Sequence, residues 1–202
     1  NDDAVDAIAH NAQLAGLKLI HSEVRHLGTE MCPAILTRMR DALRERVDVM
    51  TNTPVDQVLV EDGRVVGVKT ASGVTIKADY VILAPGRVGS DWLAAEAQRL
   101  NLKTMTNPVD VGVRIEMPAA VMQHITDVVY EPKLIYYTKS FDDRVRSFCV
   151  CPNGEVVIEK HDGVTSVNGH SYARKKSDNT NFALLVSTQF TEPFHEPITY
   201  GR

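Results

Sequence analysis

The chain has 202 residues, of which 44% are hydrophobic and 24% charged, and its formal net charge is -4. This length and composition are enough to bury one good core or two small ones, so we expect a globular protein. The weak negative charge provides no broad basic field. It therefore disfavours nucleic acid and anionic membrane surfaces as partners and leaves a small-molecule ligand as the first expectation.

The termini and the hydropathy pattern bear on location. The apolar stretches fall well short of the roughly 20 residues that a membrane-spanning helix needs. The N-terminal Asn1-Asp2-Asp3 has neither the basic region nor the apolar core of a signal peptide, so we predict a cytoplasmic protein without membrane association. Because no initiator Met is present and the chain stops directly after an apolar run, we expect both ends to be cuts in a longer protein.

The first hundred residues alternate between helical and β-rich patterns. The predicted helices span 4–17, 33–46 and 91–100. The predicted strands span 18–25, 47–50, 55–60, 64–70, 74–78 and 80–84. The run Tyr80 to Ala84 is continuously apolar, which predicts a strand buried on both faces. The next turn is rich in glycine and ends at Ser90, which we predict to cap the third helix.

Beyond Lys103 the composition shifts toward β-branched and aromatic residues with many turn signals, which indicates a second domain. The predicted strands span 109–116, 134–138, 144–150, 155–159 and 182–188, and a helix spans 118–128. Cys151-Pro152-Asn153-Gly154 is predicted to be a hairpin turn, whereas the polar tract from Asn168 to Asn181 is predicted to be irregular.

The cysteines and histidines give no metal or disulfide pattern, so no metal site is predicted. On one regular strand, Cys149 and Cys151 would project to the same face about 6.6 Å apart, near the upper limit for a disulfide. The local sequence offers Cys149 no base or cation that would lower its pKa. We interpret both residues as ordinary buried or half-buried thiols.

The meander, the apolar run and the glycine turn, taken in this order, resemble the second part of the FAD domain in glutathione-reductase-like flavoproteins. Small residues are needed in such a turn because the backbone must contact the dinucleotide. In those flavoproteins a Val after the preceding strand presents its backbone to adenine, and Val55 holds the matching place. The resemblance thus implies cofactor contacts by Val55, Ala84, Pro85, Gly86 and Arg87, although turn glycines alone are also typical of ordinary strand ends.

Several phrases also look like those of a family of uncharacterised bacterial FAD-dependent dehydrogenases. They are His26-Leu27-Gly28-Thr29, Ala84-Pro85-Gly86-Arg87 with Trp92-Leu93, Asp110 to Glu116, Phe148 to Val156, and Val167-Asn168-Gly169-His170-Ser171. The resemblance implies an FAD-dependent oxidoreductase that transfers a hydride to or from a small-molecule substrate, and it leaves NAD(P)H open as the electron donor.

The expected fold class is α+β (α/β), with an incomplete three-layer FAD/NAD(P)-binding domain at residues 31–103. Residues 1–30 and 104–202 are expected to form a mostly antiparallel, β-rich substrate domain. The chain departs from the family because it has no G-x-G-x-x-G loop and no acidic residue for the adenosine ribose. We therefore expect FAD binding by these 202 residues alone to be weak or absent, and the chain by itself to be inactive.

Candidate substrate-side residues are Arg114, Asn168 and His170, and the candidate catalytic histidines are His170 and His26. Both histidines lie among turn residues, where functional groups concentrate, and histidine titrates near neutral pH. Arg114 alternates with apolar residues, so it also fits the solvated face of a strand. The alternative function is a non-catalytic ligand- or partner-binding module. A G-x-G-x-x-G loop encoded upstream would favour the enzyme.

Overall fold

The computed structural model of the chain describes residues 2–161, 164–191 and 193. The chain divides into two compact units, Asn1–Met39 with Thr106–Arg202 and, separately, Arg40–Met105. We call them the sheet unit and the meander unit. Helices and antiparallel sheets occur together, so the predicted mixed α+β class is confirmed. Among the described residues, no helix is long and apolar enough to cross a membrane.

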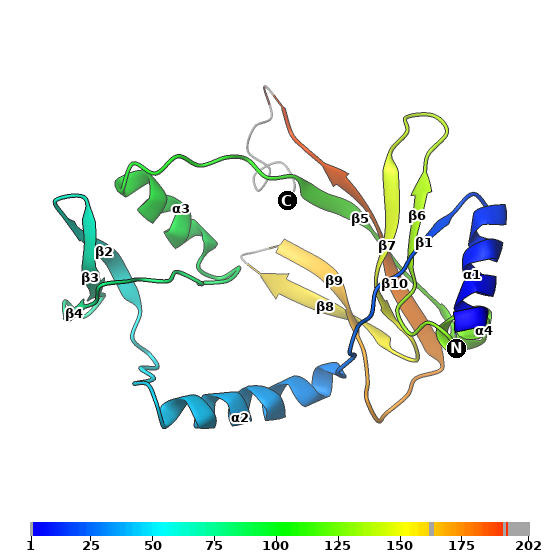
Figure 1. Cartoon of the computed structure of the whole chain (residues 1–202), viewed down its shortest axis with the longest axis horizontal. Helices are drawn as coiled ribbons and strands as arrows, with labels where there is room; N and C mark the ends of the chain where they lie inside the picture. Colours follow the sequence, from blue (N-terminus) through cyan, green and yellow to red (C-terminus); the bar gives the residue numbers. More distant parts are fainter. Residues whose placement is uncertain (1, 162–163, 192, 194–202) are drawn as a thin grey trace. The chain divides into compact units, whose positions relative to one another are not determined.

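The sheet unit is built on five antiparallel strands in the order β1-β6-β7-β10-β5 (Figure 1). Their bounds are β1 (Lys18–Ile20), β5 (Val109–Pro118), β6 (Lys133–Tyr137), β7 (Arg144–Cys151) and β10 (Asn179–Thr188). β10 pairs with β5 from Asn179 opposite Pro118 to Thr188 opposite Val109. This long ladder satisfies the backbone of β10 on both sides and makes it the central strand.

A hairpin and two helices contact this sheet. The hairpin consists of β8 (Glu155–His161) and β9 (Val164–His170), and it contacts β5, β7 and β10. Helix α1 (Asp2–Leu14) packs against β1, and α4 (Ala119–Thr126) packs against β5 and β10 (Figure 1). The buried residues include apolar side chains at Ala12, Ile135 and Val150, but also the polar Thr180 and Asn181.

The meander unit contains β2 (Val55–Glu61), β3 (Arg64–Thr70) and β4 (Thr75–Lys77), paired antiparallel in this order, and α3 (Ser90–Arg99). Asp62 and Gly63 between β2 and β3 both have positive φ, at 49° and 75°, which matches the twist of a tight hairpin. Helix α2 (Cys32–Arg44) contributes residues 32–39 to the sheet unit and 40–44 to the meander unit. A short 3-10 turn, η1 (Thr29–Met31), precedes it.

Helix α3 is bonded to β2 through side chains. The buried Glu96, only 4% exposed, accepts a hydrogen bond from Val58 N at 2.5 Å. Arg99 donates to Val58 O at 2.6 Å and also pairs with Glu96. Trp92 Nε1 donates to Asp56 O at 2.8 Å. β2 is an edge strand, so one side of its backbone has no neighbouring strand. The side chains of α3 form hydrogen bonds with backbone N–H and C=O groups that a neighbouring strand would otherwise pair.

The prediction of a buried strand at residues 80–84 is wrong. The segment is irregular, and Tyr80 and Ile82 are 90% and 92% exposed. Among the described residues, no strand pairs with it. An apolar run shows that burial would be favourable, but a strand forms only when a neighbour takes up its N–H and C=O groups. The expected strand at 47–50 is absent as well.

Four smaller expectations are also corrected. The strand predicted at 18–25 is formed only over Lys18–Ile20. Gly89, not Ser90, is the N-cap of α3. The turn at 151–154 forms, but β8 leaves β7 and pairs with β9, so it is not a hairpin turn. The tract 168–181, expected to be irregular, contains the end of β9 and the start of β10, because cross-strand partners override its low β-propensity.

Candidate functional site

Two loops that lie far apart in the sequence are joined in the sheet unit. Thr29 N donates to Ser171 O at 2.9 Å, and Ser171 N donates to Thr29 Oγ1 at 3.4 Å. The Glu30 carboxylate accepts hydrogen bonds from the backbone N–H groups of residues 173 and 174. A Cβ at Gly28 would collide with the backbone of residue 173, so only glycine allows this approach. The segments around His26 and His170 therefore lie next to each other in the fold.

This convergence forms a pocket of about 270 Å³, which we call the Tyr172 pocket. Its lining comprises His26, Leu27, Gly28, Tyr130, Pro152, Asn153, Tyr172, Ala173 and Lys176. His26 Nε2 is hydrogen bonded to the Tyr130 hydroxyl at 3.0 Å, and their ring centroids are 4.1 Å apart. Burial raises the pKa of Tyr130, which keeps its hydroxyl protonated at neutral pH. Stacked aromatic rings with polar edges suit a planar, polar ligand.

The other predicted polar residues of β9 lie close by but outside the lining. The His170 ring contacts the Tyr172 ring at a centroid distance of 4.6 Å. The Tyr172 hydroxyl in turn donates to Glu155 Oε2 at 2.8 Å. Asn168 donates from Nδ2 to Glu159 Oε1 at 2.9 Å and is therefore engaged within its own hairpin. Roles of His26, His170 and Asn168 toward a substrate stay predictions.

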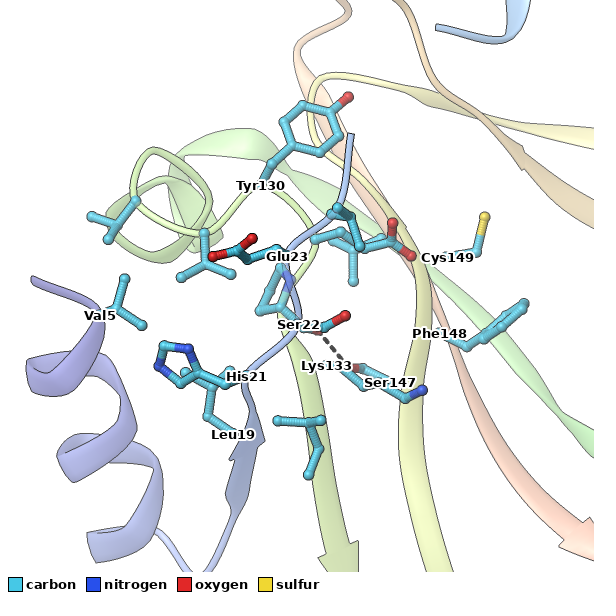
Figure 2. A pocket seen from close by; sticks show the side chains of 17 residues that line it. Val5, Leu19, His21, Ser22, Glu23, Tyr130, Lys133, Ser147, Phe148 and Cys149 are labelled. Carbon is cyan, nitrogen blue, oxygen red and sulfur yellow. Dashed lines mark hydrogen bonds between the residues drawn. The ribbon is translucent and has the colours of Figure 1, made fainter. Parts of the chain in front are cut away.

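A larger pocket of about 480 Å³ lies beside the Tyr172 pocket and shares Tyr130 with it (Figure 2). Val5 of α1, the segment His21 to Val24, and residues 128–133 and 147–150 contribute to its lining. Ser147 donates to Pro132 O at 2.7 Å and accepts from residue 134 N at 2.8 Å, which fixes one wall. The volume falls in the range of small-molecule sites. Sequence reasoning missed this pocket because its walls come from four separate segments.

Arg114 does not lie on a solvated face, contrary to one interpretation of its alternating pattern. It is partly buried and donates from Nη1 to Asn181 Oδ1 at 2.5 Å and to Cys149 O at 3.3 Å. Asn181 is fully buried. Glu116, two residues along β5, instead accepts from Val156 N at 2.8 Å. Arg114 therefore brings its charge to the strand that carries the cysteines.

Cys149 is half-buried and Cys151 is buried, as expected, but the charge of Arg114 adds an effect on Cys149. A hydrogen bond from the Cys151 thiol and the nearby Arg114 guanidinium together lower the pKa of Cys149 to about 6, although partial burial acts in the opposite direction. The pKa of Cys151 is raised by the same thiol pair and by burial. The local sequence could not reveal this, because the cation comes from β5, 35 residues away. All three cysteines are free.

The meander unit has a pocket of its own, of about 350 Å³, which we call the Trp92 pocket. It is lined by Val55, Ile82, Leu83, Ala84, Pro85, Gly89 and Trp92. Three of the five predicted cofactor residues, Val55, Ala84 and Pro85, are thus brought together, whereas Gly86 and Arg87 are not in the lining. The sequence alone indicated no role for Trp92. Only its packing beside Val55 shows that it forms a wall.

The Trp92 pocket fits one part of a dinucleotide. Gly86 has a φ of 66°, and a Cβ built there would have no protein atom within 4 Å. The turn therefore keeps an open space beside an exposed backbone, and the apolar walls suit a planar ring. The 202 residues contain no glycine-rich phosphate loop. Among the described residues, no group of three or more His, Cys, Asp or Glu side chains could hold a metal ion.

Comparisons with known proteins agree with this partial fit. The model of an FAD binding domain matches residues 10–132, which include the Trp92 pocket. The model described as FAD-dependent protein, C-terminal domain-like, matches residues 108–199. An uncharacterised protein of Clostridium beijerinckii is 26% identical over 173 residues, covering 80% of this chain but 32% of that relative. The chain spans about a third of the relative's length. It belongs to the FAD binding domain family.

Proposed function

We propose that the protein is part of an FAD-dependent oxidoreductase and that its Trp92 pocket contacts the adenine end of the cofactor. The observation that carries this proposal is that the FAD binding domain match encloses a pocket containing three of the five residues expected at the cofactor. Bound FAD supplies hydride transfer, here with a small organic substrate. NAD(P)H is proposed as the electron donor.

The residues of the Trp92 pocket would hold the adenine by shape. Val55 begins β2, so its backbone lies at the end of a ladder, where a ring edge can reach it. The side chains of Ala84 and Pro85 are small and project little from the turn. Gly86 has a positive φ, a backbone conformation that other residues rarely adopt. The bond from Trp92 Nε1 to Asp56 O holds the indole in place.

The substrate would lie in the sheet unit, in the Tyr172 pocket or the larger pocket beside it. When a hydride leaves a carbon that bears an O–H or N–H group, the heteroatom loses a proton, and a histidine is suited to accept it. His26 is proposed for this role because Tyr130 orients its ring through the 3.0 Å hydrogen bond. Lys176, in the same lining, would attract an anionic group of the substrate.

Titration of the 202-residue chain with FAD, AMP and FMN tests the cofactor assignment. Without a phosphate loop, two or three charge-assisted hydrogen bonds of about 1.5 to 3 kcal/mol each are missing, so we expect FAD to bind at micromolar Kd or weaker. AMP should compete with FAD, because both carry the adenine, whereas FMN should not. Calorimetry and flavin fluorescence measure both effects.

A matched pair of variants locates the site. Gly86→Leu fills the space beside the turn and should weaken FAD and AMP binding by about tenfold or more, the loss of roughly 1.4 kcal/mol. Gly63→Leu is the control, since Gly63 also has a positive φ and open surroundings but lies in the β2–β3 turn. Equal effects of both variants, or tight binding of FMN, would contradict the assignment. The absence of saturable adenine binding would favour a non-catalytic binding module.

A further inference from the structure

The two cysteines of β7 are brought together by a bulge. Asn181 of β10 pairs with Cys151, while Ala183 pairs with Phe148, so two residues of β7 oppose one residue of β10. The extra residue in β7 is accommodated at Cys149, whose φ is 48°. A regular strand would hold the side chains of residues i and i+2 about 6.6 Å apart. The bulge breaks this spacing, and the Cys151 side chain turns back toward Cys149, so that Cys151 Sγ lies 3.4 Å from the Cys149 backbone oxygen.

Polar groups lie around the thiol pair. Cys151 Sγ also donates to Cys149 O at 3.4 Å, the same oxygen that Arg114 contacts. A Cβ at Gly169 would collide with Arg114 Nη1, Asn181 Oδ1 and Cys151 Sγ, so these three groups gather closely against the glycine backbone. The buried Asn181 Nδ2 has no partner among the described residues. A buried N–H group without a partner beside the thiol pair requires an explanation.

The two thiols differ in access. Cys151 is 2% exposed, whereas Cys149 is half-buried. Figure 2 shows the sulfur of Cys149 at the rim of the larger pocket, pointing away from Val5 and His21. An incoming reagent therefore meets Cys149 first, and Cys151 is placed to react second.

We propose that Cys149 and Cys151 form a thiol–disulfide exchange site, in which Cys149 attacks a small disulfide and Cys151 completes the exchange. This site goes beyond the proposed FAD chemistry, requires no flavin, and is carried by the bulge, the thiol pair, Arg114 and the unpartnered Asn181 amide. The ligand class is a low-molecular-weight disulfide, R–S–S–R.

The exchange balances without another reactant. The Cys149 thiolate forms a bond to one sulfur of the disulfide, the S–S bond breaks, and RS⁻ leaves and takes up the proton that Cys149 lost. Cys151 then attacks Cys149 Sγ and displaces the second RS⁻, which takes up the Cys151 proton. The two cysteines are oxidised by two electrons to one disulfide, and R–S–S–R is reduced to two RSH. Arg114 favours the Cys149 thiolate throughout.

The probe is the aromatic disulfide 5,5′-dithiobis(2-nitrobenzoic acid), used on the full chain without flavin and in a Cys32→Ser background. This protein should release two equivalents of thionitrobenzoate and end without a bound adduct by mass. Adding Cys151→Ser should stop the reaction after one equivalent and leave an adduct on Cys149. Adding Cys149→Ser should slow the release at least about tenfold, because the remaining thiol is buried and has a raised pKa.

The pH profile gives a second measurement. The rate in the Cys32→Ser protein should be half-maximal near pH 6, following the pKa of Cys149. At about pH 6 the native protein should react about twentyfold faster than the same protein unfolded in urea, since the gain in thiolate outweighs its lower nucleophilicity. Arg114→Lys should retain most of this gain. A persistent adduct in the Cys32→Ser protein, or a Cys149→Ser variant that reacts as fast as that protein, would overturn the proposal while leaving the FAD assignment untouched.

Discussion

Each unit contains an apolar run, but one run is buried and the other is exposed. Ile135 lies within β6, between β1 and β7, and is 4% exposed. Ile82 lies in the more apolar run Tyr80 to Ala84 of the meander unit and is 92% exposed. The difference is that β6 has a strand on each side, whereas residues 80–84 have none among the described residues. Hydrophobicity makes burial favourable, but only a partnered backbone can be buried.

The two units also bury polar groups in different ways. In the sheet unit, the buried Asn181 contacts Arg114 at a bulge and keeps one N–H unpartnered. In the meander unit, the buried Glu96 is satisfied by Val58 N and Arg99. A satisfied group stabilises a fold, whereas an unsatisfied one is a feature to be explained by a ligand or reaction. The unpartnered Asn181 amide lies in the sheet unit, beside the thiol site that we propose.

The largest expected effect tests the contrast of the two isoleucines directly. Ile135→Ala should lower the free energy of unfolding by about 2 to 5 kcal/mol, because it leaves a cavity between strands. Ile82→Ala should change it by less than about 0.5 kcal/mol, as for other exposed sites. Urea unfolding followed by circular dichroism measures both. A large loss for Ile82→Ala would mean that residues 80–84 are buried after all.

A second pair of substitutions tests whether the units unfold separately. A Cβ at Gly112 in β5 would collide with Leu184 O, and a Cβ at Gly67 in β3 with Ile76 O. Gly112→Ala and Gly67→Ala should therefore each cost about 1 to 3 kcal/mol. Hydrogen exchange should show the loss of protection in the sheet unit for the first and in the meander unit for the second. Loss of protection throughout the chain in both variants would argue for one cooperative unit.

A smaller loss of stability is expected from the removal of the Glu96 charge. The hydrogen bond from Arg99, and then that from Val58 N, hold the pKa of Glu96 below its ordinary value of 4.5, against the effect of burial. The stabilisation is therefore complete above pH 4.5 and is lost as the pH falls through the lower, folded-state pKa. Glu96→Gln should lose about 1 kcal/mol at neutral pH, the difference between a charge-assisted and a neutral bond to Val58 N–H.

The pH dependence provides the control for Glu96→Gln. The difference in unfolding free energy between this variant and the parent should shrink in urea titrations as the pH falls below 4.5 and the parent carboxylate becomes protonated. Arg99→Gln should have a smaller effect, because its side chain is 41% exposed and water screens the pair. A difference that stays constant with pH would contradict the assigned role of the Glu96 charge.

Local signals in the sequence were sufficient for much of this fold. The apolar periods at α1 and α2, the turn at Asp62-Gly63 and the three runs of the meander all predicted elements that form, because such signals depend on neighbours within a few residues. The sequence by itself also excluded a G-x-G-x-x-G loop. The residues at Val55 and at the Ala84 to Arg87 turn resemble those of FAD-binding proteins, and the matching FAD binding domain model covers both.

Only the tertiary structure decided which of these segments meet. Thr29 and Ser171 are 142 positions apart, and Arg114 and Cys149 are 35 apart, so no periodicity or turn pattern could pair them. The same holds for the exposure of Ile82, which depends on a missing strand neighbour and not on its own apolar run. Propensity and side-chain period act within a few residues, whereas the partner of a backbone N–H or of a buried charge is chosen across the whole chain.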